Sequence, residues 1–294
     1  MKITTTGSLG NVGKPLVKLL VAAGHEVTVI TSSMERKEAI EALGAKAAVG
    51  SISDPEFLTR AFTGANAVFT MTPPAMGTNI IANIANAGKA YAAAILASGV
   101  QRVVMLSSIG ADQDQGTGPI QGVHLVEQTY QQLQGVNVTI LRAGYFYYNF
   151  FRDIPLIRNQ HMLGSNYNGG DKLLLAHPED IASAIAGELQ SEGNGMEVKY
   201  IVSDISTGTE AAATLGKAIG QPELPWVVIS DAQLEQGMLS AGLPQELAGL
   251  LTEMGRALRQ GLVTQHFFAS APEVRGRTKL ADFAAEFREK YEAY

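Results

Sequence analysis

The sequence predicts an α/β protein: a Rossmann-like, doubly wound parallel sheet with a small, mostly helical C-terminal substrate lobe. Short apolar runs alternate with helical patterns from Lys2 to Val202. Such alternation requires a parallel sheet with helices on both faces. A glycine-rich turn directly follows the first short β run, Lys2 to Thr6, and helical patterns dominate after Ser203. The turn predicts where a nucleotide binds, and the helical ending predicts the lobe.

The composition excludes several classes of protein. The chain has 294 residues, 46% of them hydrophobic, which is enough for a sizeable core in one domain or in two joined lobes. The net charge of −6 argues against nucleic acid held by charge alone. Without cysteine, thiolate metal sites and disulfides are impossible. No signal peptide is evident, and the apolar stretch 79–97 contains Asn83, Asn86 and Lys89, so we expect a cytoplasmic protein without a membrane span.

The elements follow in order along the chain. Expected strands cover residues 2–6, 27–30, 45–49, 67–71, 102–106, 136–141 and 198–202. Expected helices cover residues 14–23, 35–43, 54–62, 78–97, 121–134, 179–189, 208–219, 231–241, 244–260 and 278–291. Asp54 before Pro55 is a good helix start, because an aspartate can cap a helix that begins with proline. Residues 145–176 are aromatic and irregular in pattern. We therefore assign 1–144 plus 177–203 to the dinucleotide-binding domain and 145–176 plus 204–294 to the small lobe.

The turn after the first strand has glycines spaced G-x-x-G-x-x-G. Gly7 allows the chain to turn off the strand, Gly10 lets a pyrophosphate approach the backbone, and Gly13 lets the helix pack close to the sheet. The start of the following helix offers free N–H groups and a partial positive charge to phosphates. We expect the nucleotide to contact Gly7, Ser8, Leu9, Gly10, Asn11, Val12 and Gly13.

The end of the second strand indicates which nucleotide binds. Dinucleotide sheets that prefer NAD usually place an acidic residue there, which accepts a hydrogen bond from the ribose 2′-hydroxyl. This chain has Ser32 and Ser33 instead, followed by Arg36. A solvated helix face would also explain Arg36, but the missing acid favours NADP (NADPH) over NAD.

Five segments together resemble a known family. The first resembles the nucleotide fingerprint of atypical short-chain dehydrogenases/reductases, and the others resemble their NmrA-like branch. The segments are Thr6–Gly13, Leu106–Asp112, Leu141–Phe146 with Asn149, Pro178–Ala182 and Thr278–Phe283. The resemblance implies a Rossmann-like domain that binds NAD(P) and a small substrate lobe. Members include quinone and dye reductases, as well as redox-sensing regulators that bind the nucleotide without evident turnover.

One departure from the enzyme pattern concerns proton transfer. Short-chain reductases typically use Tyr-x-x-x-Lys, but the chain contains no such motif. Counting back from Glu127, the lysine position falls on Val123 and the tyrosine position on Pro119. His124 is the titratable side chain near that place that exchanges protons near neutral pH. It is the candidate acid, and a helix histidine bonded to solvent or to Glu127 is the alternative.

Further candidates follow the strands at the edge where open α/β sheets bind ligands. Ser108 could bond a substrate carbonyl or simply cap a turn. Met71, Thr72, Pro73 and Pro74 could form a wall beside the nicotinamide ribose. Tyr145 opens an aromatic run that supplies core and could line a pocket for a planar substrate. The five histidines show no metal-ligand spacing, so no metal site is expected.

Two functions remain open at this point. An oxidoreductase would pass hydride from NADPH to a small planar acceptor such as a quinone. Reduction of such an acceptor depends little on a proton donor in the protein. A non-catalytic NADP(H)-sensing protein would bind the nucleotide and present its surface to a protein partner. The sequence does not identify the acceptor, the partner or the oligomeric state.

Overall fold

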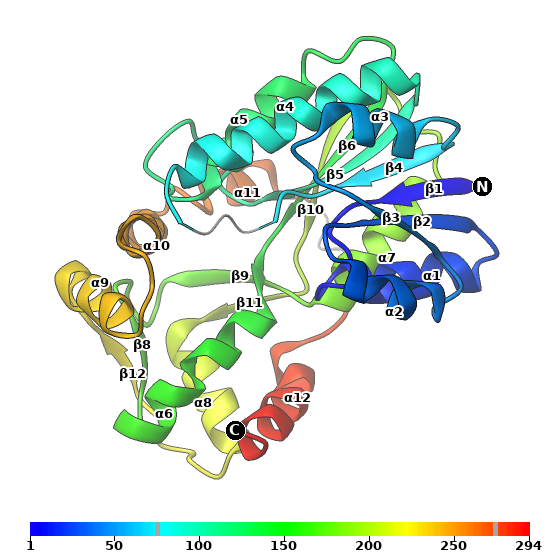
Figure 1. The fold of residues 1–294 in the computed structure, drawn as a ribbon. Coiled ribbons are helices and arrows are strands. Elements are labelled where there is room, and N and C mark those ends of the chain that lie inside the picture. Colours follow the sequence, from blue (N-terminus) through cyan, green and yellow to red (C-terminus); the bar gives the residue numbers. More distant parts are fainter. Residues whose placement is uncertain (74–76, 273–275) are drawn as a thin grey trace.

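The computed structural model describes residues 1–73, 77–272 and 276–294. Its centre is a parallel sheet (Figure 1). In spatial order its strands are β10 (Met196–Ile201), β6 (Asn137–Ala143), β5 (Arg102–Ser108), β4 (Ala67–Thr70), β1 (Lys2–Thr5), β2 (Glu26–Thr31) and β3 (Lys46–Val49). All neighbouring pairs are parallel. The predicted doubly wound sheet is confirmed.

Helices cover both faces of this sheet, as the βα alternation requires. Figure 1 shows α1 (Gly13–Ala22), α2 (Lys37–Glu41) and α7 (Pro178–Leu189) on one face. The other face carries α3 (Pro55–Phe62), α4 (Ile80–Ser98) and α5 (Ile120–Tyr130). Each face has its own apolar core, because successive strand residues point to opposite sides. The start of α3 is as expected, since Asp54 accepts from the N–H groups of Glu56 and Phe57.

Helix α4 is long and apolar enough to cross a membrane by length and composition, yet 56% of it is buried within the fold. It packs between α3 and α5, and its buried positions include Ile84, Tyr91 and Ile95. Burial in this core explains the apolar composition.

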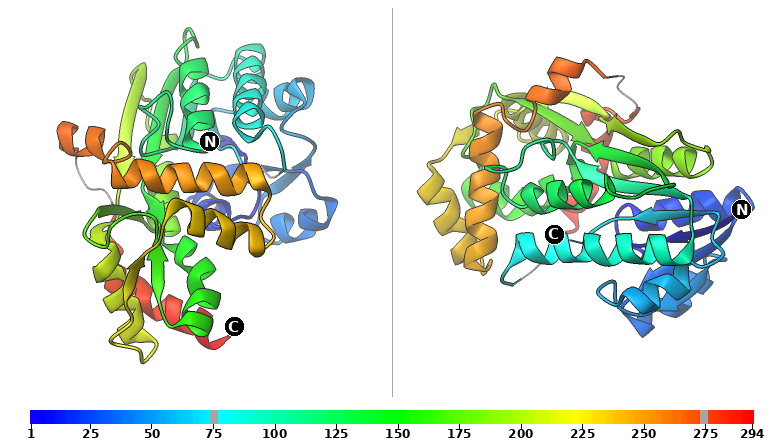
Figure 2. Two further views of the ribbon diagram at one scale, coloured as in Figure 1. Left: turned by 90° about the vertical axis from the view of Figure 1, so that its left-hand side faces the viewer. Right: turned by 90° about the horizontal axis from the view of Figure 1, so that it is seen from above.

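The rest of the chain forms further structure beyond the carboxyl ends of the strands. One small sheet contains β7 (Tyr145–Phe146), β9 (Lys172–Ala176) and β11 (Asp204–Thr207), and another contains β8 (Leu163–Ser165) and β12 (Trp226–Val228). The helices of this part are α6 (Ile154–Gln160), α8 (Gly208–Ala218), α9 (Asp231–Ser240), α10 (Gln245–Arg259), α11 (Gln265–Ser270) and α12 (Leu280–Glu292). Two short 3-10 helices, η1 (Met34–Arg36) and η2 (Tyr147–Asp153), complete the elements. Figure 2 shows the long helix α10 lying across the molecule between the large sheet and the smaller part.

The segment 145–176 is more regular than its pattern suggested. It contains β7, η2, α6, β8 and β9. These elements are short, and their rings and aliphatic side chains face one shared core with α8 and α12. Neither a period of two nor one of 3.6 residues therefore develops along the segment. The division of the chain into two domains stays a prediction.

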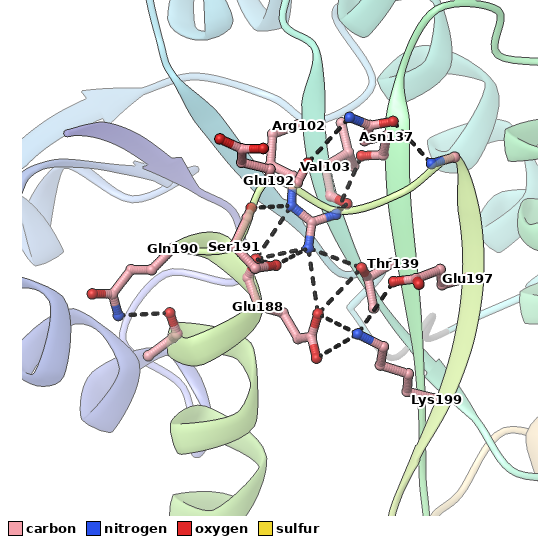
Figure 3. A network of polar contacts seen from close by, with 12 residues as sticks. Arg102, Val103, Asn137, Thr139, Glu188, Gln190, Ser191, Glu192, Glu197 and Lys199 are labelled. Carbon is pink, nitrogen blue, oxygen red and sulfur yellow. Dashed lines mark hydrogen bonds and ion pairs between the residues drawn. The ribbon is translucent and has the colours of Figure 1, made fainter.

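A network of polar contacts lies at the amino-terminal edge of the large sheet (Figure 3). Arg102 opens β5 and is 5% exposed. Its guanidinium donates to the carbonyl oxygens of Glu188 and Ser191 and to the hydroxyl of Thr139. The carboxylate of Glu188 also accepts from the Lys199 ammonium at 2.9 Å. The network joins β5, β6 and β10 to the end of α7, far along the strands from their carboxyl ends.

Candidate functional site

The glycine turn has a shape that only small residues permit. Gly7 has a φ of +86°, and Ser8 follows it at +51°. A Cβ on Gly7 would overlap the thioether of Met71, and one on Gly13 would overlap the carbonyl oxygen of Ser8. Gly13 thus lets the start of α1 lie close to the turn itself, rather than to the sheet as we expected. Gly10 is exposed, so its backbone is open to a ligand.

The remaining residues of the turn divide into inward and outward groups. Leu9 is half-buried and Val12 is 2% exposed, and both pack against the core. Only the backbone of Val12 can face a nucleotide. Asn11 is exposed, and α1 begins two residues later at Gly13, where the first N–H groups of a helix lack intrahelical acceptors. The turn therefore fits a pyrophosphate held by backbone groups.

The turn is tied to the end of β2. Ser8 Oγ donates to the hydroxyl of Thr31 at 3.1 Å, and the same hydroxyl accepts from the N–H of Ser33 at 3.3 Å. Ser32 and Arg36 are exposed beside this contact. The structure thus brings the residues expected to recognise the adenosine ribose next to the glycine turn.

The end of β4 is fixed on the other side of the turn. The N–H of Met71 donates to Thr6 Oγ1 at 2.8 Å, and the phenol of Tyr91 donates to the Met71 carbonyl at 3.0 Å. Thr72 and Pro73 follow and line a cavity. Pro74 lies outside the described residues.

This cavity has a volume of about 360 Å³ and lies at the carboxyl edge of the sheet. Several elements contribute to it: the ends of β4, β5 and β6, helix α4, the start of α5, the three-stranded small sheet and α10. The lining residues with polar groups are Thr72, Ser107, Ser108, Asn149, Tyr145 and Tyr167. The others are apolar side chains and glycines, among them Ile84, Leu106, Phe146, Leu174, Met254 and Leu258.

A buried ion pair supports the wall of the cavity from behind. Glu127, 2% exposed, accepts from Ser107 Oγ at 2.5 Å and from two nitrogens of Arg142, at 3.0 and 2.6 Å. Arg142 also lies 3.7 Å from Asp112 and donates to the phenol of Tyr200 at 3.3 Å. Burial alone would lower the pKa of Arg142, but its contacts with Glu127 and Tyr200 raise it above the usual value. The network keeps Ser107, and with it the end of β5, in place.

The two candidates for proton transfer lie in different environments. Ser108 lines the cavity, and its hydroxyl donates to the Ile109 carbonyl at 2.9 Å. His124 donates from Nδ1 to the carbonyl of Ala111 at 2.8 Å and is not among the described residues that line the cavity. The geometry therefore favours Ser108, and a catalytic role for His124 gains no support from it. Val123 and Pro119, at the positions of the missing lysine and tyrosine, do line the cavity.

Helix α10 closes the cavity on the side away from the sheet, a role that sequence patterns did not indicate. Met254 and Leu258 face the cavity from α10. At the other end of the helix, the carboxylate of Glu246 accepts from the N–H groups of Asn79 and Ile80, each at 2.7 Å, and so caps α4. Tyr167, which lines the cavity beside α10, was missed because its segment showed no periodicity.

Comparisons with known proteins agree with this geometry. The profile of the NmrA-like family matches residues 1–266. The chain belongs to the NmrA-like family. It is 27% identical to an NAD(P)H azoreductase from Xenophilus azovorans over 289 residues, 96% of each chain. It is 26% identical over 222 residues to a (4-alkanoyl-5-oxo-2,5-dihydrofuran-3-yl)methyl phosphate reductase from Streptomyces griseus, which covers 75% of this chain and 74% of that protein.

Solved structures of similar proteins have the same fold. An NADPH-dependent quinone oxidoreductase from Escherichia coli, in complex with NADPH, has a TM-score of 0.82 at 22% identity, over 97% of this chain and 99% of that chain. A triphenylmethane reductase from Citrobacter sp. has a TM-score of 0.83 at 17% identity, over 98% of this chain and 100% of that chain. These likenesses confirm the Rossmann-like fold. The match to the family profile confirms the predicted family.

Proposed function

We propose that this protein is an NADPH-dependent reductase that delivers hydride to a planar acceptor such as a quinone. The observation that carries the proposal is the position of the cavity. It begins at Met71, which contacts the glycine turn, and it ends against α10. A nucleotide bound along the turn would therefore direct its nicotinamide into an apolar pocket with aromatic walls. The azoreductase, the quinone oxidoreductase and the dye reductase above support a reaction of this class.

The residues present fit the nucleotide. A Cβ at Gly7 or Gly13 would fill the turn, while Gly10 and Asn11 remain open to a pyrophosphate. The end of β2 carries no carboxylate that would repel a 2′-phosphate, and Arg36 is exposed within one turn of it. These features favour NADPH over NADH. The NADPH complex of the quinone oxidoreductase supports this preference.

The chain's own groups would orient the acceptor more than activate it. Bound NADPH supplies the hydride. The amide of Asn149 can donate to a carbonyl oxygen of the acceptor, and so can the hydroxyl of Ser108 once it turns away from the Ile109 carbonyl. The rings of Tyr145 and Phe146 can contact the plane of the acceptor. A quinone that accepts hydride needs one proton, which water can supply, so the missing Tyr-x-x-x-Lys pair does not prevent this reaction.

The test combines nucleotide binding with turnover. We expect NADPH to bind more tightly than NADH in calorimetry, and NADPH oxidation to depend on an added quinone. Gly10→Val places a branched side chain where the pyrophosphate approaches, so it should weaken NADPH binding at least tenfold, about 1.4 kcal/mol. Because Gly10 is exposed, the fold should persist, which circular dichroism checks.

Gly187→Val is the matched control, because an added Cβ at the exposed Gly187 has no neighbour within 4 Å and no positive φ is required there. Equal NADPH affinity in the wild type and Gly10→Val would exclude the turn as the site. Binding without oxidation of NADPH by any quinone would instead support the nucleotide-sensing alternative.

A further inference from the structure

The lining of the cavity contains no charged side chain among the described residues. Lysine, arginine, aspartate, glutamate and histidine are all absent from it, although Glu127 and Arg142 lie directly behind Ser107. From this we infer that the acceptor is an uncharged molecule of one or two fused rings, and that the cavity rejects anionic acceptors. The inference rests on the proposed function and specifies its substrate class.

The charged side chains behind the cavity wall are not available to bind an anion. The guanidinium of Arg142 is already engaged by Glu127, Asp112 and Tyr200. It is 7% exposed and is not among the described residues that line the cavity. A sulfonate or carboxylate in the cavity would lose its hydration without gaining a cation. An unpaired charge transferred from water to apolar surroundings is strongly disfavoured, whereas a neutral ring gains from the same transfer.

The size of the cavity limits the acceptor further. A volume of about 360 Å³ is near the lower end for pockets that bind small molecules. In the proposed function the nicotinamide ring and the acceptor share this space. One or two fused rings fit beside the nicotinamide, and a larger dye would require α10 to move.

Contacts at both ends of α10 oppose such a movement. Glu246 caps α4 near the start of the helix. At its middle, the Thr252 carbonyl accepts from the buried amide of Asn166, which also donates to Asp231, each at 2.9 Å. Arg256 donates to the same aspartate at 2.8 Å. Met254 lies between these contacts and faces the cavity, so its side chain is well placed to set the charge preference.

The reaction balances without further groups. The acceptor gains one hydride from NADPH and one proton from water, so a quinone becomes a quinol as NADPH becomes NADP⁺. The chain has no cysteine, so quinones cannot form thiol adducts with it. Quinones are therefore suitable probes.

The test compares menadione with a naphthoquinone sulfonate of the same ring size. We expect the wild type to reduce menadione with a kcat/KM at least 100-fold higher, although the sulfonate is the stronger oxidant. Calorimetry without nucleotide should show menadione binding and no sulfonate binding. Met254→Lys should lower the menadione-to-sulfonate ratio at least tenfold, and Met254→Gln, of similar length but neutral, should leave the ratio within threefold of the wild type.

The outcomes separate the inference from the proposed function. Similar kcat/KM values for the two quinones in the wild type would overturn the inference and leave the reductase intact. An unchanged ratio in Met254→Lys would overturn the role of α10 in charge selection. If neither quinone is reduced while menadione alone binds, the proposed function fails and the charge preference of the cavity stands. If neither quinone binds or reacts, the inference fails.

Discussion

Arg102 and Arg142 are buried on neighbouring strands of one sheet, but they lie at opposite edges of it. Arg102 begins β5 and donates largely to carbonyl oxygens, so it fastens chain segments together. Arg142 lies near the end of β6 and donates to the carboxylate of Glu127, which in turn accepts from Ser107 in the cavity wall. The same type of side chain thus joins chain segments at the amino-terminal edge and supports the cavity wall at the carboxyl edge. The difference indicates which buried charge should affect the reaction.

Replacement of the arginine near the site should have the largest effect. Arg142→Met leaves Glu127 buried without its main partner, and breaking a buried ion pair in this way costs about 3–5 kcal/mol of unfolding free energy. Denaturation by urea measures the loss. Turnover per folded molecule should fall as well, because Ser107 loses its support. The double variant Arg142→Met/Glu127→Leu should recover part of the stability, and a double variant less stable than the single one would contradict this account.

Asp153, a half-buried carboxyl group without a bound arginine, sharpens the comparison. Asp153, at the end of η2, makes no ion pair among the described residues, and burial raises its pKa to about 7 against a weaker attraction from Arg152. A raised pKa means that the folded state holds a proton which the unfolded state releases. The stabilising contribution is complete below about pH 4 and is lost as pH rises through about 7.

The loss of unfolding free energy from Asp153 is at most about 4 kcal/mol, and it is smaller where water reaches the carboxylate. Asp153→Asn cannot ionise, so its unfolding free energy relative to wild type should rise between pH 5 and pH 8. Urea denaturation at the two pH values measures this difference. A constant difference would show that Asp153 is ionised in the folded protein at both.

Replacement of the arginine at the far edge should have the smallest effect. Arg102→Met leaves carbonyl oxygens unsatisfied, at a cost of about 1–3 kcal/mol. Glu188 keeps the Lys199 ammonium at 2.9 Å. We expect kcat/KM per folded molecule to match the wild type for NADPH and for menadione. A selective change in either value would mean that the two edges are coupled, and that the comparison is wrong.

The large sheet was predictable because its signals are local. Val103, Met105 and their neighbours form a short apolar run, and glycine spacing and helix starts such as Asp54-Pro55 are read within a few residues. The cavity depends on positions that are far apart in the sequence. Nothing near Tyr167 or Met254 indicates that they face Ser108 across the site. Such contacts arise only once the strands and α10 are packed.

Two charged residues did leave a signal in the sequence. Arg142 directly follows the apolar residues Ile140 and Leu141, and a charge beside such residues in a strand requires a partner. The pattern could have indicated that a carboxylate lies nearby, but not that Glu127 supplies it. Asp180 lies in the first turn of α7, where a negative charge suits the helix dipole. In the structure its carboxylate also accepts from Ser203 and from the N–H groups of Arg277 and Thr278, which lie 97 and 98 residues away.

The cap that Glu246 provides for α4 has a consequence for how the protein is made. Its two acceptor contacts reach back 167 and 166 residues along the chain. A ribosome therefore completes α4 and much of the large sheet well before the residue that secures the first turn of that helix exists. Until then, we expect the start of α4 to fray in the nascent chain. Amide hydrogens of Asn79 and Ile80 should likewise exchange faster in Glu246→Ala than in the wild type.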